Sequence, residues 1–200
     1  MYIPEHFRVN DEHVLRQFAA ANSFGMLITH GQELMASHLP LLLEGANLVG
    51  HVARGNPQAK DIEAGLPALA IFHGPHAYVS PSWYADPQTA VPTWNYTAVH
   101  VYGKPRVITD PNSVKQLLER LVSKYESARE SPWGFDMDAQ HIDNLIRGIV
   151  AFEMPIDRME GKFKLSQNRP IGDRGRVMWS LKSSESQMDQ QVAAMMSDLF

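Results

Sequence analysis

The stretch that decides the fold covers residues 24–54 and reads FGMLITHGQELMASHLPLLLEGANLVGHVAR. Its first six residues are rich in strand-forming types, and two further strand-like runs follow at 34–43 and 48–54. Short turns that contain Gly31 or Asn47 separate the runs, and turns of this length join antiparallel neighbours. This stretch therefore predicts three consecutive antiparallel strands.

Strand patterns continue toward the C-terminus, at residues 67–73, 77–83 and 97–108. Six short strands joined by tight turns are typical of a barrel. On the N-terminal side, Asn10 or Asp11 can cap a short helix that ends near Asn22.

The clearest helix in the chain begins at Asp110-Pro111, because an acidic cap and a first-turn proline precede a helical apolar repeat. A second helix over 139–147 and a last strand over 149–154 follow. The expected fold is thus mainly β within the α+β class, a barrel of about six antiparallel strands with peripheral helices.

Residues 1–182 are expected to form one domain that includes a basic C-terminal segment. Residues 183–200 read as a linker and a short amphipathic helix, with Met188, Val192 and Met196 on its apolar face. Such a face needs a partner, and another subunit is one candidate.

Composition excludes several classes of protein. The chain has no cysteine, which rules out disulfides, thiolate nucleophiles and Cys-ligated metal sites. The net charge is −4, yet residues 158–182 hold seven cations and two anions, a local charge of +5 that favours an anionic ligand nearby. No apolar stretch is long enough to span a membrane, and the N-terminus has no signal-peptide pattern, so a cytoplasmic location is expected.

Several runs are long and irregular enough to be specific: Pro81-Ser82-Trp83-Tyr84, Val91 to Tyr96, and Lys164-Leu165-Ser166-Gln167-Asn168. With the Met1-Tyr2-Ile3-Pro4 start, Ser37 to Pro40 and Gly50 to Pro57, they make the chain resemble the FMN-binding negative transcriptional regulator (PaiB) family over residues 1 to about 182. The resemblance implies a flavin split-barrel fold, related to that of pyridoxamine-phosphate oxidases, and a homodimer with FMN between the subunits.

FMN needs charged donors for its phosphate and an apolar slot with a few polar groups for its ring. Arg54 follows a strand, and the split-barrel relatives place a phosphate-binding arginine at the matching strand end. Asn56 and Lys60 complete the expected phosphate half. Gly55 stands where the oxidases tend to carry lysine, so Lys60 or Lys162 would substitute for it.

The ring half is assigned to His38, Leu39 and Pro40, where extended backbone can approach the flavin edge. Trp94 and Asn95 lie on a proline-bounded loop and could reach the flavin across the dimer. The remaining candidate donors are Lys162, Ser166 and Gln167.

Each assignment has a structural alternative. Arg54 can be a salt-bridged surface arginine, Asn56-Pro57 a turn, and Trp94 a core or interface residue. The basic segment can be a solvated face. Five histidines lie on or beside strands, but they lack metal-ligand spacing, so no metal site is expected.

Two functions stay open: an FMN-binding regulator, and an FMN-dependent oxidoreductase that acts on an unknown small molecule. No residue stands out as a catalytic acid or base, and no nicotinamide fingerprint is present. Direct DNA binding has little support, because no helix-turn-helix is evident and the main helix must turn its apolar stripe to the core.

Overall fold

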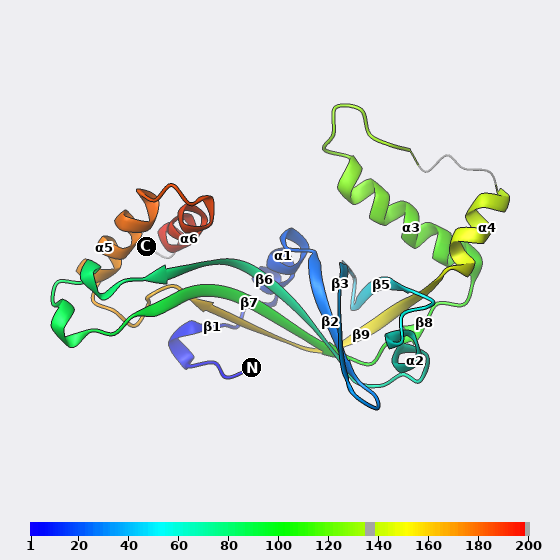
Figure 1. The fold of residues 1–200 in the computed structure, drawn as a ribbon, viewed down its shortest axis with the longest axis horizontal. Coiled ribbons are helices and arrows are strands. Elements are labelled where there is room, and N and C mark those ends of the chain that lie inside the picture. The colour runs from blue at the N-terminus through cyan, green and yellow to red at the C-terminus, as the bar shows by residue number, and fades with distance from the viewer. Residues whose placement is uncertain (135–138, 199–200) are drawn as a thin grey trace. The chain divides into compact units, whose positions relative to one another are not determined.

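The computed structural model describes residues 1–134 and 139–198. The chain forms two compact units: unit 1 comprises residues 1–18, 73–100 and 160–200, and unit 2 comprises residues 19–72 and 101–159. Three long strands contribute residues to both units, namely β6 (Ala68–Val79), β7 (Thr93–Gly103) and β9 (Ile149–Lys164) (Figure 1).

The antiparallel strands predicted from residues 24–54 are present in unit 2. There β2 (Phe24–His30) pairs with β3 (Leu34–Pro40), and β4 (Leu42–Glu44) pairs with β5 (Asn47–Ala53). The sheet order is β3-β2-β6-β7-β9-β5-β4, and the short strand β8 (Arg106–Val107) pairs with β9. The expected 34–43 strand divides at Leu41, because the Leu41 amide donates instead to the Ser23 carbonyl at 2.8 Å.

Further strand bounds were also predicted wrongly. The strands expected at 67–73 and 77–83 are one strand, β6, which continues through Gly74. A Cβ on Gly74 would lie 2.6 Å from the Phe18 ring, so glycine here allows a close approach and does not mark a turn. The last strand, β9, runs on to Lys164, and the expected 97–108 strand divides into β7 and β8. Because β7 begins at Thr93, Trp94 and Asn95 lie in a strand and not on the expected loop.

The core of unit 2 lies under α3 (Pro111–Glu126), the helix that the apolar repeat predicted. Asp110 caps it by accepting a hydrogen bond from the Ser113 amide at 2.9 Å. Burial of each large side chain on its inner face contributes about 1.5–3 kcal/mol. The packed residues are Val114, Leu117 and Leu121 on the helix and Leu42, Val49 and Ala151 on the sheet.

Two further helices belong to unit 2, α2 (Gln58–Glu63) and α4 (Ala139–Arg147). The predicted 139–147 helix is therefore confirmed. The helix predicted to follow Asn10 or Asp11 is also confirmed as α1 (Glu12–Ala21).

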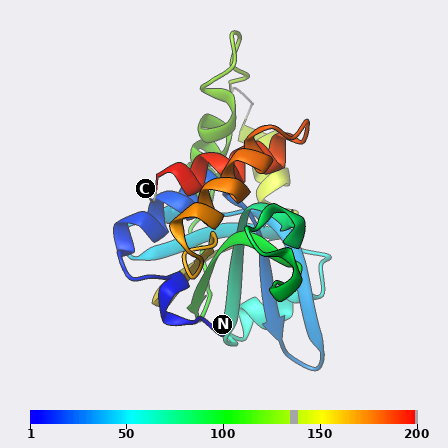
Figure 2. The same ribbon diagram turned by 90° about the vertical axis from the view of Figure 1, so that its left-hand side faces the viewer.

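Unit 1 carries α5 (Ile171–Lys182) and α6 (Gln187–Ser197), which lie side by side (Figures 1 and 2). It also contains the short strand β1 (Arg8–Val9) and three 3₁₀ helices, η1 (Glu5–Phe7), η2 (Pro81–Trp83) and η3 (Pro87–Thr89). None of the described helices is long and apolar enough to cross a membrane.

The predicted tail helix is α6, and the part of its apolar face that holds Val192 and Met196 is covered within this chain. Val192, Ala193 and Met196 are at most 2% exposed, and the Met196 sulfur lies 3.6 Å from the Asn95 side-chain amide. The α5 helix and the β7 region therefore cover this part of the face, whereas Met188 is 40% exposed, and a partner for the rest of the face stays a prediction. Residues 199 and 200 of the predicted tail lie outside the described part.

Candidate functional site

The residues predicted to hold FMN fall into both units, and each set is described within its own unit. Unit 2 contains His38, Leu39, Pro40, Arg54, Asn56 and Lys60. Unit 1 contains Trp94, Asn95, Lys162, Ser166 and Gln167.

The end of β3 presents its residues to different surroundings, because neighbouring side chains alternate across a strand. His38 is exposed and stacks on the exposed Phe24 ring, with 6.4 Å between the centroids. Leu39 is buried. Pro40 lines a groove.

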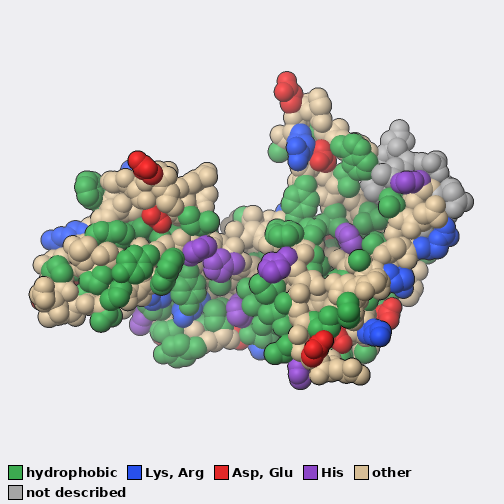
Figure 3. All heavy atoms as spheres, viewed as in Figure 1, with side chains coloured by type: hydrophobic (Ala, Val, Ile, Leu, Met, Phe, Trp, Pro, Cys, Tyr) green, Lys and Arg blue, Asp and Glu red, His purple; other side chains and the backbone are tan. Residues whose placement is uncertain are grey.

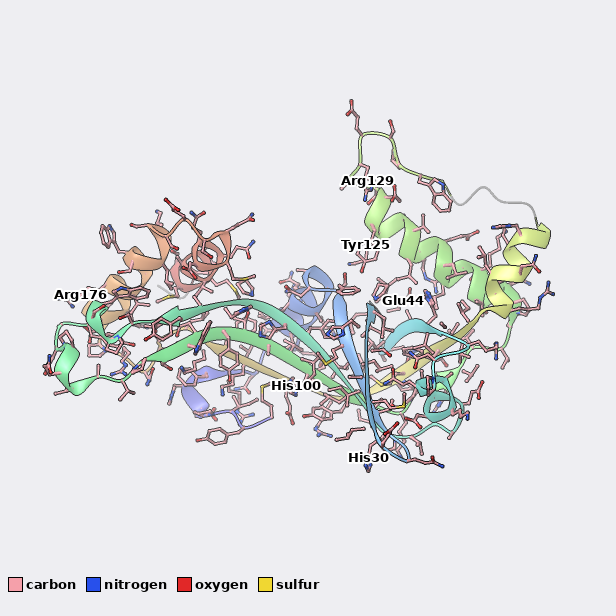
Figure 4. All side chains as sticks on the ribbon, viewed as in Figure 1. His30, Glu44, His100, Tyr125, Arg129 and Arg176 are labelled. Carbon is pink, nitrogen blue, oxygen red and sulfur yellow. The ribbon has the colours of Figure 1, made fainter. Side chains whose placement is uncertain are left out.

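The groove lies between the β3 and β5 strands and the C-terminal half of α3, with a volume of about 300 Å³. Its wall on α3 includes Tyr125, which is labelled in Figure 4. The Tyr125 hydroxyl is hydrogen-bonded to the Ser23 hydroxyl at 2.8 Å. Most of the remaining lining is apolar or aromatic: Leu118, Leu121, Val122 and Trp133, with the Glu126 side chain beside them.

His51 on β5 also lines this groove. Its Nδ1 atom is buried and has no hydrogen-bond partner among the described residues. Burial lowers the pKa of the His51 imidazole, which favours the neutral ring near pH 7. The unpartnered nitrogen of a neutral imidazole can donate or accept one further hydrogen bond.

Arg54 does not present a free guanidinium. Its Nε donates to the Arg147 carbonyl at 2.9 Å and its Nη2 to the Ile149 carbonyl at 2.7 Å, so it closes the C-terminal end of α4. Its Nη1 lies 3.7 Å from a Glu63 carboxylate oxygen. The salt-bridged alternative therefore describes its present contacts, and phosphate binding by Arg54 stays a prediction.

Asn56 also has partners inside unit 2. Its Nδ2 donates to the Ser37 hydroxyl at 2.9 Å, and its Oδ1 accepts from the Gln58 amide at 3.0 Å. These contacts tie the start of α2 to β3, beside His38. Lys60 is exposed on α2, and no described residue is hydrogen-bonded to its amine.

In unit 1, Asn95 and Ser166 form a buried pair. They are 1% and 4% exposed, and Asn95 Nδ2 donates to the Ser166 hydroxyl at 3.0 Å, which donates back to Asn95 Oδ1 at 3.2 Å. Gln167 is also used locally, because its side chain accepts from the Leu165 amide and donates to the Phe163 carbonyl. These three predicted ligands brace the turn that follows β9.

Lys162 and Trp94 differ in exposure. Lys162 is 8% exposed, and its amine donates to the Tyr2 carbonyl at 3.2 Å and lies 5.2 Å from the centre of the Tyr96 ring. Trp94 is 52% exposed. Of the five predicted residues in unit 1, Trp94 is therefore the one that presents most of its surface to a ligand or partner.

Sequence reasoning missed His51 and Tyr125 as site residues. The period of α3 places Tyr125 on its apolar stripe, and His51 alternates with buried strand residues, but neither pattern shows that the two line one groove. No cluster of three or more potential metal ligands occurs among the described residues.

Solved structures share this fold. The FAD and heme binding protein from Mycobacterium smegmatis matches with a TM-score of 0.63 and 14% identity, over 78% of this chain and 73% of that one. The flavocytochrome Anf3 from Azotobacter vinelandii matches with a TM-score of 0.62 and 13% identity, over 81% and 72% of the two chains. The protein therefore has the antiparallel split-barrel fold of flavin-binding proteins.

Sequence relatives define the family. Residues 1–158 match the family described as "Putative FMN-binding domain". The Bacillus subtilis "Protease synthase and sporulation protein PAI 2" is 37% identical over 204 residues, covering 99% of this chain and 97% of that protein. The chain belongs to this FMN-binding domain family, and FMN is its cofactor.

The groove at His51 fits the flavin ring. A flavin ring has apolar faces and a polar edge; the groove offers mostly apolar walls, and His51, which lines it, has a buried ring nitrogen without a partner among the described residues. Pro40 and His51 would hold the ring, and the FMN, when bound, supplies a group that takes up and releases electrons.

Proposed function

We propose that the protein is an FMN-binding regulator of gene expression, similar in role to PaiB-type negative transcriptional regulators. The observation that carries this proposal is the similarity over almost the whole length of both chains to a relative named for protease synthesis and sporulation. In this role FMN acts as a sensory or structural ligand, and its ring occupies the groove at His51.

We also propose that FMN lies at the interface of a homodimer. Trp94 and Tyr78 are 52% and 45% exposed on unit 1, with 5.9 Å between their ring centroids, and His76 lies 6.2 Å from Trp94. Hydrophobic side chains and histidines gather over β6 and β7 in Figure 3. An exposed aromatic cluster of this kind is typical of a protein interface.

FMN titration and light scattering test the site and the dimer. His51→Gln is expected to weaken FMN binding, and the exposed His30 provides the matched control His30→Gln. Trp94→Ala is expected to lower the scattering mass from about twice 22.5 kDa and to weaken FMN binding. Trp179→Ala, on an exposed tryptophan of α5, should change neither quantity. A monomeric Trp94→Ala variant that binds FMN with full affinity would refute the proposal that FMN lies at the dimer interface.

The regulatory role is tested in the host cell. Deletion of the gene should change transcript levels, and His51→Gln should reproduce the change if FMN controls the response. Unchanged transcripts, together with turnover of the bound flavin by NAD(P)H and a small-molecule substrate, would favour the oxidoreductase instead.

A further inference from the structure

The turn after β9, residues 165–170, is held in one conformation by buried polar contacts. Ser166 has a φ of +67°, in the left-handed region that a residue with a Cβ adopts at a cost of about 1–2 kcal/mol. The buried hydrogen bonds from Asn95 and the two side-chain bonds of Gln167 maintain it. Strained positions that the surroundings maintain in this way often occur at binding sites.

Three cations of unit 1 precede this turn or lie within it. Lys164 donates to the Trp94 carbonyl at 2.6 Å and to the Thr93 hydroxyl. Lys162 precedes it on the same face of β9, and the Arg169 guanidinium lies over the Tyr84 ring, 4.6 Å from its centre. Among the described residues, none of the three cations is paired with a carboxylate. Asp173, the acid that follows the turn, is bonded to the Ala85 amide and to Arg176.

The electrostatics of this cluster are unfavourable without an anion. Burial lowers the pKa of the Lys164 amine, and the positive charges of Lys162 and Arg169 lower it further. Partly buried like charges repel one another more strongly than charges in water do. A bound anion would offset that repulsion.

A second observation at the cluster is an unpartnered hydroxyl. Tyr84 is 5% exposed, and its OH has no hydrogen-bond partner among the described residues, although a buried hydroxyl ordinarily has one. Arg169 covers the ring that carries this hydroxyl. The unpartnered hydroxyl therefore belongs to a residue that contacts Arg169, one of the three cations.

We propose that Lys164 and Arg169, with Lys162 behind them, form a binding site for the phosphate group of a phosphate monoester. The turn holds Lys164 and Arg169 in place, and a phosphate dianion provides acceptors for charge-assisted hydrogen bonds from both side chains. The monoester is either FMN itself or a second phosphorylated small molecule. The site does not depend on the groove at His51, so it can be tested separately.

Calorimetry with inorganic phosphate at low ionic strength tests the site. Lys164→Gln and Arg169→Gln are each expected to weaken phosphate binding about tenfold or more, because each removes a charge-assisted donor. Lys164→Arg should retain most of the affinity. Lys182→Gln, at an exposed lysine of α5 in the same unit, removes the same charge and should leave the affinity unchanged. Thermal unfolding of each variant confirms that it is folded.

A comparison of FMN with riboflavin identifies the source of the phosphate. If the phosphate belongs to FMN, Lys164→Gln weakens binding of FMN but not of riboflavin, and inorganic phosphate competes with FMN. If it belongs to a second molecule, phosphate binds equally well to the FMN-saturated protein. Equal affinity for phosphate in the wild type, Lys164→Gln and Arg169→Gln would overturn the proposal, whatever the result for His51→Gln.

Discussion

Asn95→Ala is expected to destabilise the protein by about 2–4 kcal/mol. The substitution leaves the Ser166 hydroxyl buried and without its partner, which costs about 1–3 kcal/mol. The two lost hydrogen bonds, at 3.0 and 3.2 Å, and the space left under Met196 add about 1 kcal/mol. For a chain of this size, each kcal/mol lowers the melting temperature by about 2–4 °C.

Urea unfolding of the FMN-free protein measures this loss, and two Ser166 variants provide controls. Ser166→Ala breaks the same pair and keeps the left-handed backbone cost, whereas Ser166→Gly breaks the pair but removes that cost. Ser166→Gly should therefore be the more stable of the two. The Asn95→Ala/Ser166→Ala double variant should lose less stability than the sum of its single changes, because neither partner remains unpaired.

Two results would refute this reasoning. One is an Asn95→Ala protein that unfolds at the same urea concentration as the wild type. The other is strict additivity in the double variant, which would mean that Asn95 and Ser166 do not form a coupled pair. A change in the flavin spectrum with unchanged stability would instead support the role in flavin binding that the sequence predicts for Asn95.

Three further predictions concern stability. Arg54→Ala should lower the free energy of unfolding in urea by about 0.5–1.5 kcal/mol, because the hydrogen bonds to the Arg147 and Ile149 carbonyls are lost. If the variant loses more affinity for FMN than for riboflavin, Arg54 does not have a purely structural role. Burial is the main cause that lowers the pKa of His51, His73 and His100 in the folded protein, so the unfolded chain binds more protons. The melting temperature should therefore fall as the pH drops below about 6.5, and a flat profile from about pH 8 to pH 5 would be contrary evidence. Leu117→Ala should cost about 2–5 kcal/mol in the same unfolding assay, whereas Leu34→Ala, at a 73% exposed position, should have little effect, and similar losses would contradict the described core.

Local sequence patterns predicted the elements whose periodicity is regular. Helix α3 has an acidic cap, a first-turn proline and an unbroken apolar stripe, and all three signals come from neighbouring residues. The hairpins in residues 24–54 follow equally from short turns between apolar runs. Family motifs added the flavin fold and the cofactor, which periodicity alone does not contain.

Strand ends were harder to predict, because glycine and proline ordinarily mark turns. Gly74 lies within β6 because Phe18 packs against its backbone. Pro155 lies within β9, opposite Asn47 at the start of β5, where the paired ladder of β5 ends. In both cases the deciding neighbour is distant in sequence.

The sequence by itself determined the class of fold, the main helix, the antiparallel hairpins and the family, because these depend on local periodicity and on contiguous motifs. Only the tertiary structure decided which polar residues are free to meet a ligand. Asn95, Asn56 and Arg54 look like ligands in the sequence, yet each has partners far along the chain. His51 looks like an ordinary strand residue, yet it lines an apolar groove, and its buried Nδ1 has no hydrogen-bond partner among the described residues. A side chain's hydrogen-bonding capacity is fixed by its chemistry, but whether that capacity is already used depends on which distant segments pack beside it.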